Sequence, residues 1–127
     1  MNKYANQDIL AIEIKKKLEH YSTILLAGHF CIFNKSNYVE KLPNSIFGKI
    51  SIEQILLLEA APIRILTNLN IRDKKNYELR HIELLLKKDR QAAVAIFQKC
   101  NCSLHIHQMF YDGSDLRKCC ELLNMEE

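Results

Sequence analysis

Gln54-Ile55-Leu56-Leu57-Leu58 is the stretch that decides the fold, because its apolar run is typical of a strand buried on both faces. Pro62 follows closely and predicts a helix that runs to about Asn70, since proline is favoured at the first helical position. A buried strand that leads directly into a helix is the repeating unit of parallel sheets. This stretch therefore favours an α/β architecture.

The neighbouring segments support the same class. Residues 22–27 form a second apolar run that ends at Gly28, and they predict another buried strand. A helix is predicted over 6–20, with Leu10, Ile14 and Leu18 on its apolar face, and a hairpin of 31–33 and 38–39 follows it. A short helix is predicted from about 45 to 50, and a long helix capped by Asn76 over 77–100. The last two elements are a third strand over 103–110 and a helix from about 114 to 125. Alternating strands and helices predict one three-layer domain over residues 1–127, with about three parallel strands and helices on both faces.

Composition excludes several classes of protein. The 127 residues are 48% hydrophobic and 26% charged, which is ordinary for one globular domain. The net charge of +3 is too small to indicate nucleic-acid binding, and no apolar stretch is long enough to span a membrane. Five cysteines, an odd number, occur without a secretory signal, so we expect free thiols and a cytoplasmic location.

Several short motifs, taken in order, resemble the later part of adenylate kinase and related P-loop nucleotide kinases. The motifs are Leu25-Leu-Ala-Gly-His-Phe30, Leu42-Pro-Asn-Ser-Ile-Phe47, Ile55-Leu-Leu-Leu-Glu-Ala-Ala-Pro62, Ile65-x-x-Asn68-x-x-x-Arg72 and the alanine-rich end of the long helix. The resemblance extends from about residue 6 to residue 123. It implies a P-loop-kinase-like sheet and a nucleotide or nucleoside as substrate, with ATP and Mg²⁺ as cofactors.

The phosphate-binding loop of that family is missing from the sequence. Such a loop reads G-x-x-x-x-G-K-[ST], and its backbone N–H groups and lysine hold the phosphates. Gly48-Lys49 is the nearest candidate, but Pro43 stands where the first glycine belongs and Ile50 replaces the hydroxyl residue. Phosphoryl transfer depends almost entirely on positioning and charge neutralisation. We therefore expect a truncated or degenerate kinase-like domain that is inactive by itself.

Other positions of the resemblance have also changed. Ala27 stands where the family has an acidic residue at the strand end, and Asn68 stands where it has its first lid arginine. Only Arg72 keeps its place in the lid. If any nucleotide binds, the resemblance makes His29, Arg72 and Arg80 the candidate phosphate contacts, although His29 can equally be a strand-end histidine satisfied by the backbone.

The missing loop also removes a strand. In the resembled family that strand lies between the strands that match 22–27 and 54–58. Either these two strands pair directly, or a partner chain supplies a strand, or exposed sheet edges lead to a homodimer. The alternative to a kinase-like role is thus a non-catalytic interaction module that uses an exposed sheet edge.

A cysteine–histidine cluster and a run of basic residues each have a functional interpretation and a structural one. Cys100, Cys102, His105 and His107 could supply zinc ligands, but a C-x-C spacing is unusual for structural zinc, and a helix end followed by a strand explains the segment equally well. A basic run could contact phosphate or nucleic acid, but a solvated helix face laced by Glu78, Glu83 and Asp89 is the simpler interpretation. That run comprises Lys74, Lys75, Arg80, Lys87, Lys88, Arg90 and Lys99.

Overall fold

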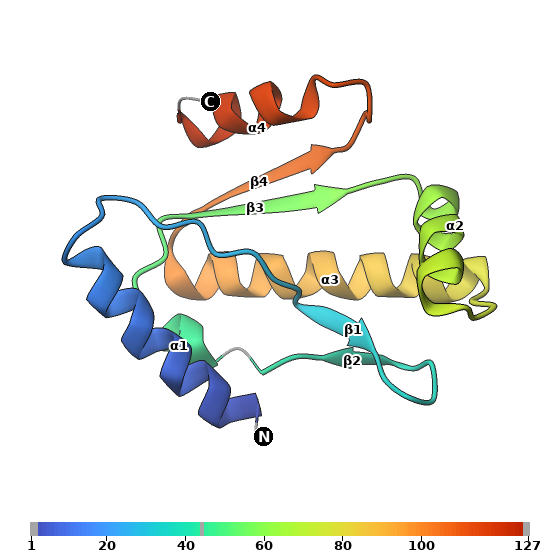
Figure 1. The fold of residues 1–127 in the computed structure, drawn as a ribbon, viewed down its shortest axis with the longest axis horizontal. Helices are drawn as coiled ribbons and strands as arrows, with labels where there is room; N and C mark the ends of the chain where they lie inside the picture. Colours follow the sequence, from blue (N-terminus) through green and yellow to red (C-terminus); the bar gives the residue numbers. More distant parts are fainter. Residues whose placement is uncertain (1–2, 44, 126–127) are drawn as a thin grey trace.

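The computed structural model describes residues 3–43 and 45–125, and its elements are of mixed α/β type (Figure 1). The elements are α1 (Lys3–Leu18), β1 (Cys31–Phe33), β2 (Val39–Lys41), the 3-10 turn η1 (Ser45–Gly48), β3 (Gln54–Glu59), α2 (Pro62–Asp73), α3 (Leu79–Cys100), β4 (Ser103–Gln108) and α4 (Asp115–Leu123). The predicted order of helices and strands is confirmed except at one position, the apolar run 22–27.

Residues 22–27 form no strand, so the predicted sheet of about three parallel strands is wrong. Instead, β3 and β4 form a parallel pair, in register from Gln54 opposite Ser103 to Glu59 opposite Gln108. The predicted hairpin is confirmed as a separate antiparallel pair of β1 and β2. A strand requires a neighbour for its backbone hydrogen bonds, and the expected direct pairing of 22–27 with β3 does not form.

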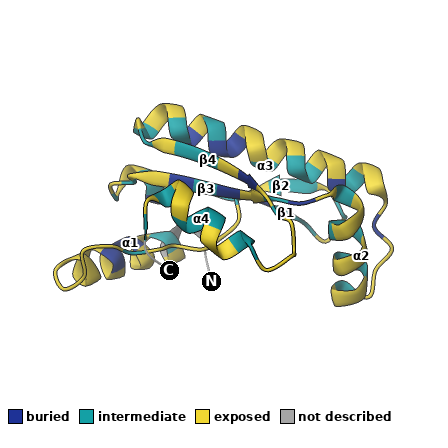
Figure 2. Cartoon of the chain, turned by 90° about the horizontal axis from the view of Figure 1, so that it is seen from above, coloured by how far each residue is buried: buried dark blue, intermediate teal, exposed yellow. Residues whose placement is uncertain are grey.

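The two faces of the β3–β4 pair are covered by different helices (Figure 2). On one face, Glu59 is hydrogen-bonded to Arg90 of α3. On the other face, the Gln54 side chain donates a hydrogen bond to the carbonyl oxygen of Leu123 in α4. Successive side chains of a strand point to opposite faces, so Ile55 and Leu57 share the α3 face with Glu59. Both are buried there.

Helix α3 supplies most of the core against this sheet. Its buried side chains recur at helical spacing and are Ile82, Ala92, Ala93 and Ile96. The helix begins two residues later than predicted: Glu78, not Asn76, is the N-cap, and its backbone N–H donates to Nδ1 of His81 at 3.1 Å. Likewise α2 extends to Asp73 and ends at Lys74, which adopts a left-handed conformation.

A second, smaller cluster lies at the amino-terminal side of the chain. Ala11 and Ile14 of α1 pack on Ile46 of η1, and Ile24 joins them from the segment after α1. Of the apolar face predicted for this helix, only Ile14 is buried, whereas Leu10 and Leu18 are exposed. The contact of Ile24 with this cluster holds the following residues on the α1 side, away from β3.

Candidate functional site

The two edges of β3 differ in their backbone hydrogen bonds. The carbonyl of Glu53 accepts from the N–H of Ser103 at 3.0 Å, and the carbonyl of Glu59 accepts from Met109 at 2.7 Å. Bonds of a parallel ladder come from alternate residues, so the odd-numbered residues of β3 face β4. The backbone groups of Gln54, Leu56 and Leu58 therefore face the opposite edge, where no described residue pairs with them.

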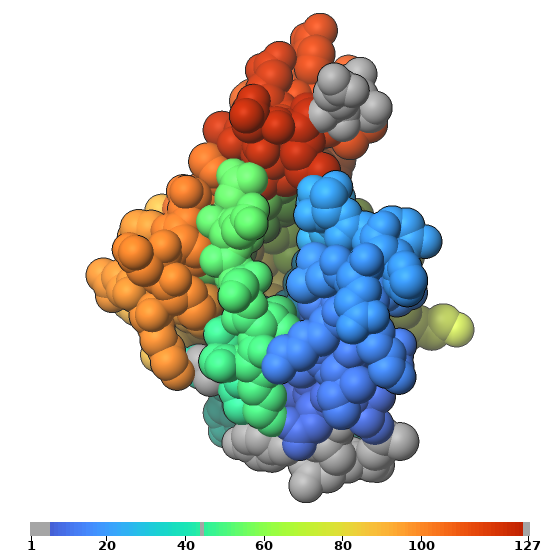
Figure 3. Space-filling view, turned by 90° about the vertical axis from the view of Figure 1, so that its left-hand side faces the viewer, coloured from blue at the N-terminus to red at the C-terminus, as the bar shows by residue number. Residues whose placement is uncertain are grey.

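This unpaired edge faces a hollow that we call the central groove, bounded by β3 and by the extended segment 22–29. The segment runs along the side of β3 that is turned away from β4 (Figure 1). Figure 3 looks along the strands. The hollow lies between the green residues, which lead into β3, and the blue residues of the amino-terminal part of the chain. The side chains of Leu58 and Leu25, one in each wall, are 51% and 71% exposed.

The segment 22–29 is held in place at both of its ends. Ile24 packs on the α1 cluster, as described above. At the other end, the carbonyl of Phe30 accepts a hydrogen bond from Leu42 at 2.8 Å, and the ring of Phe30 lies 6.1 Å from that of Phe47. The far wall of the central groove is thus attached to the hairpin, η1 and α1 rather than to β3.

A cavity of about 140 Å³ lies between this wall and α3. Its lining is largely apolar and includes Leu26, Phe30, Ile46, Ala92 and Ile96. An apolar cavity of roughly this volume can hold a benzene-sized group. Short alanine side chains on α3 are one reason that space remains there.

Asp89 of α3 lies beside Phe30 and Cys31, where the segment 22–29 leads into β1. Burial raises the pKa of its carboxyl group, and the backbone amides of Phe30 and Cys31 oppose that rise. The negative charge of Glu59, at the end of β3, adds to it, whereas His29 lowers it. The sequence placed Asp89 on a solvated face, and this is wrong: its Oδ1 atom is buried and has no hydrogen-bond partner among the described residues.

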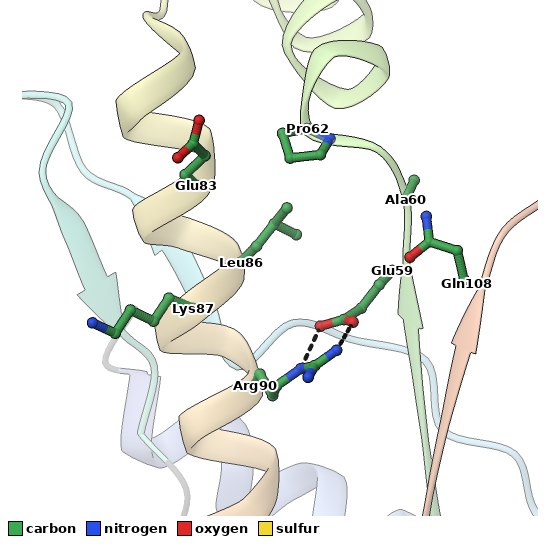
Figure 4. Close-up of a pocket in the computed structure, with 8 residues that line it drawn as sticks. All are labelled: Glu59, Ala60, Pro62, Glu83, Leu86, Lys87, Arg90 and Gln108. Carbon is green, nitrogen blue, oxygen red and sulfur yellow. Dashed lines mark hydrogen bonds and ion pairs between the residues drawn. The ribbon is translucent and has the colours of Figure 1, made fainter.

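A second cavity, of about 320 Å³, opens at the carboxyl ends of β3 and β4 (Figure 4). Arg90 and Glu59 form a bidentate ion pair along one side of it, with 3.0 Å between Nε and Oε2. Glu83, Leu86 and Pro62 line the opposite side. Because the guanidinium of Arg90 is already paired with a carboxylate, the cavity offers no free cation from that residue.

The loop between β4 and α4 is organised by one carboxylate. Asp115 accepts hydrogen bonds from the backbone N–H groups of Phe110 and Tyr111, at 2.9 and 2.8 Å, and it contacts Nε2 of the buried His107 at 2.7 Å. The Phe110 amide and then His107 hold the pKa of Asp115 at about 2. Sequence reasoning missed this role and predicted only a strand over 103–110 followed by a helix from about 114.

Two exposed aromatic rings of this loop each carry a cation. The guanidinium of Arg64, near the start of α2, lies 4.2 Å from the ring centre of Tyr111. The ammonium of Lys118 lies 3.8 Å from that of Phe110. No sequence pattern indicated this pairing, because α2 and the β4–α4 loop are far apart along the chain.

The three predicted phosphate contacts are not brought together by any hydrogen bond or ion pair of the described residues. His29 is exposed in the segment before β1. Arg72 donates to Asp73 at 2.7 Å, and Arg80 pairs with Glu78 at 2.6 Å. Both arginines are therefore held by acidic neighbours of their own chain, and a phosphate would have to displace these carboxylates.

The possible zinc ligands have other contacts. His105 and His107 share one face of β4, but His105 contacts the Gln54 side chain at 3.0 Å and His107 contacts Asp115. The thiol of Cys100 lies 3.7 Å from the carbonyl oxygen of Phe47. Within residues 3–43 and 45–125, no three histidine, cysteine or acidic side chains form a group that could hold a metal ion.

Comparison with known proteins adds no family to these observations. No family model and no curated protein sequence matches the chain. Among the described helices, none combines the length and the apolar character needed to cross a bilayer. The function must therefore be argued from the central groove and its surroundings.

Proposed function

We propose that this chain is a non-catalytic interaction module that accepts a polypeptide strand in the central groove. The observation that carries the proposal is the unpaired edge of β3, where Gln54, Leu56 and Leu58 present backbone donors and acceptors to a hollow. Unpaired strand edges are templates for another strand, and main-chain hydrogen bonds supply much of the affinity in such complexes. The exposed leucines on both walls favour an apolar strand.

A lone strand fits the central groove better than a second copy of the chain does. If a second copy presented its own β3, its β4 would follow on the far side, where segment 22–29 already lies. An edge-to-edge contact of six residues would also fall below about 1,200 Å², the usual lower limit for a stable interface. The occupant is therefore a single extended segment from outside residues 1–127, about six residues long to match β3.

The P-loop-kinase resemblance supports the same arrangement. It implies that the absent strand leads into the phosphate-binding loop, so a completed domain would be a kinase-like domain. The residues present do not themselves fit Mg²⁺ and a nucleoside triphosphate. None of Ala27, Gly28 and His29 carries a carboxylate that could hold Mg²⁺, and Arg72 is paired with Asp73. We assign no phosphoryl-transfer step to this chain alone.

Peptide binding tests the proposal. The probe is a fluorescent peptide of six alternating valine and isoleucine residues with a short polyethylene glycol tail, and the readout is anisotropy. Leu58→Pro removes an N–H that faces the central groove, so we expect binding at least about tenfold weaker. Ile106→Pro is the matched control, because its N–H faces the outer edge of β4.

Two outcomes would contradict strand acceptance. One is the absence of saturable binding up to about 1 mM peptide, which corresponds to a free energy of only about −4 kcal/mol. The other is an equal loss of binding in both proline variants, because it would locate the peptide away from β3. Circular dichroism of each variant checks that it is folded before binding is compared.

Nucleotide binding is the second candidate function, and the cation–aromatic loop favours it. Arg64 over Tyr111 and Lys118 over Phe110 offer stacking surfaces and positive charge at the carboxyl edge of the sheet, where open α/β folds bind ligands. Calorimetric titration with ATP and Mg²⁺ tests it. Saturable heat that weakens in Arg64→Ala and Arg72→Ala is the expected result, and no heat at millimolar nucleotide would eliminate this candidate.

A further inference from the structure

The cavity of about 140 Å³ between segment 22–29 and α3 has room for a ligand because several residues around it are small. From α3, Ala92 contributes only a methyl group, and Ala27 and Gly28 contribute little from the facing segment. A Cβ atom added to Gly28 would meet nothing within 4 Å, so open space adjoins the backbone there. An apolar cavity of about 150 Å³ is large enough to bind benzene. The space therefore suits a single small ring.

The larger side chains of the lining also favour an aromatic ligand. Phe30 and Phe47 both line the cavity, and their ring centres are 6.1 Å apart with the ring planes tilted by 53°. Tilted aromatic contacts of this kind are favourable, so a third ring packs well against either phenylalanine. Ile46 and Ile96, which are both buried, add further apolar surface.

The amide of Gln7, which also lines the cavity, is already occupied by protein groups. Its Oε1 atom accepts hydrogen bonds from Oγ of Ser45 at 2.8 Å and from the backbone N–H of Ile46 at 3.1 Å, and its Nε2 atom donates to the carbonyl of Pro43. These hydrogen bonds hold α1 against η1. Polar recognition of a ligand therefore falls to other residues of the lining.

Two basic residues, His29 and Lys41, line the cavity, and no acidic residue does so within the part of the chain that the structure describes. The hairpin brings the two together. Lys41 lies opposite Cys31 in the β1–β2 register, and the next pair is joined by the hydrogen bond from Leu42 to the carbonyl of Phe30. Lys41 is exposed and forms no ion pair with a described residue. Its positive charge is therefore available at the edge of an apolar space.

Asp89 is the acidic residue of α3 closest to this lining, three residues before Ala92. It does not itself line the cavity, and its carboxyl group accepts hydrogen bonds from the backbone amides of Phe30 and Cys31. The charge that a ligand meets directly is thus that of Lys41, which favours an anion.

We propose that this cavity binds a small aromatic carboxylate, with its ring against Phe30 and Phe47 and its carboxylate at Lys41. The lysine supplies one positive charge, which matches one carboxylate, and charge-assisted hydrogen bonds are stronger than neutral ones. The imidazole of His29 adds a hydrogen-bond donor, since a histidine has an N–H in either protonation state. The site does not depend on strand acceptance, because none of the β3 residues 54–59 lines it.

Ligand-observed fluorine NMR with three ring compounds of similar size tests the proposal. The probes are para-fluorobenzoate, fluorobenzene and para-fluorobenzylamine, which carry a negative charge, no charge and a positive charge. We expect para-fluorobenzoate to bind the unchanged chain with a dissociation constant of about 1 mM or lower, and about fivefold more tightly than fluorobenzene. The amine should bind no more tightly than fluorobenzene, because Lys41 repels it.

Lys41→Gln and Lys87→Gln are matched variants, because both lysines are exposed and each lines a different cavity. In Lys41→Gln we expect the preference for para-fluorobenzoate over fluorobenzene to fall to about twofold or less. Lys87→Gln should keep the full preference. Ala92→Leu fills the cavity and should weaken the binding of both compounds about tenfold or more, with circular dichroism as the check that it is folded.

The location of the ligand can be read without any substitution. On addition of para-fluorobenzoate, we expect the methyl resonances of Ala92, Ile46 and Ile96 to shift, because these side chains line the cavity. The methyl resonances of Ile106 in β4 and Leu122 in α4 should stay unchanged, because neither residue is part of the lining. This measurement still locates the site if Ala92→Leu proves to be unfolded.

Four results would each overturn the proposal. The first is the absence of saturable binding of para-fluorobenzoate up to about 10 mM, and the second is equal affinity for fluorobenzene. The third is a preference that survives in Lys41→Gln or is lost equally in Lys87→Gln, because the carboxylate would then not be held by Lys41. The fourth is a set of methyl shifts confined to residues outside the cavity.

Discussion

The two edges of β3 belong to the same six residues, but only one of them is hydrogen-bonded to another strand. On one edge, odd-numbered residues complete a parallel ladder with β4, from Glu53 to Glu59. On the other edge, Leu56 and Leu58 face the central groove without a partner strand. An apolar run predicts that a strand is buried, but it does not say which segment lies beside that strand. Both edges of a strand need hydrogen-bond partners for their backbone groups, and here only one edge has them.

Proline substitution at adjacent positions gives the largest expected effect. Leu57→Pro removes a ladder bond to β4 and a buried side chain, so we expect a loss of roughly 4 kcal/mol in the free energy of unfolding. Leu58→Pro affects only the unpaired edge, and we expect a loss of about 1 kcal/mol or less. Urea unfolding measures both, and equal losses would mean that the two edges are not different.

Asp89→Asn is expected to have an intermediate effect of the opposite sign. Burial raises the pKa of this carboxyl group, so folding is penalised once pH exceeds the pKa of the unfolded chain, and the penalty is complete above the folded-state pKa. At pH 7 the variant should be more stable by about 1 kcal/mol, with the difference shrinking toward pH 4 and below. Thermal unfolding at several pH values checks this, and a destabilised variant at pH 7 would show that Asp89 is already satisfied.

Asp115→Asn tests the paired side of the sheet, and its effect on stability should be full at neutral pH and disappear as pH falls toward 2. Its folded-state pKa of about 2 lies below the unfolded value, so the stability it contributes is present above about pH 4 and is lost as pH falls toward 2. The unchanged chain should therefore lose more stability than the variant between pH 4 and 2. Parallel acid dependence in the two proteins would contradict a role for this carboxylate in anchoring the β4–α4 loop.

Local patterns were enough to place most elements and some contacts. The apolar run at 54–58, the proline at 62 and the 3.6-residue periodicity of the long helix each have a short-range physical cause, and all three were confirmed. The hairpin followed from a turn: Oδ1 of Asn34 accepts from the backbone of Ser36 and Tyr38. The predicted kinase relationship, by contrast, is tested by nothing in the structure and stays a prediction.

The candidate site was less accessible from sequence. His29, Arg72 and Arg80 followed from a resemblance, and no described hydrogen bond or ion pair connects them. Asp89 was missed because charged neighbours on both sides gave it the pattern of a solvated helix face. Which side chain of such a helix turns inward depends on the segment packed against it, here Phe30 and Cys31, some sixty residues earlier.

The sequence by itself determined where helices and strands form, because caps, turns and periodicity act over a few residues. Only the tertiary structure decided that 22–29 stays apart from β3, since Ile24 and Phe30 pack elsewhere. Strand pairing joins segments that are distant along the chain, and competing contacts settle it rather than local propensity. For that reason the central groove and the burial of the Asp89 carboxyl group are properties of the fold and not of any motif.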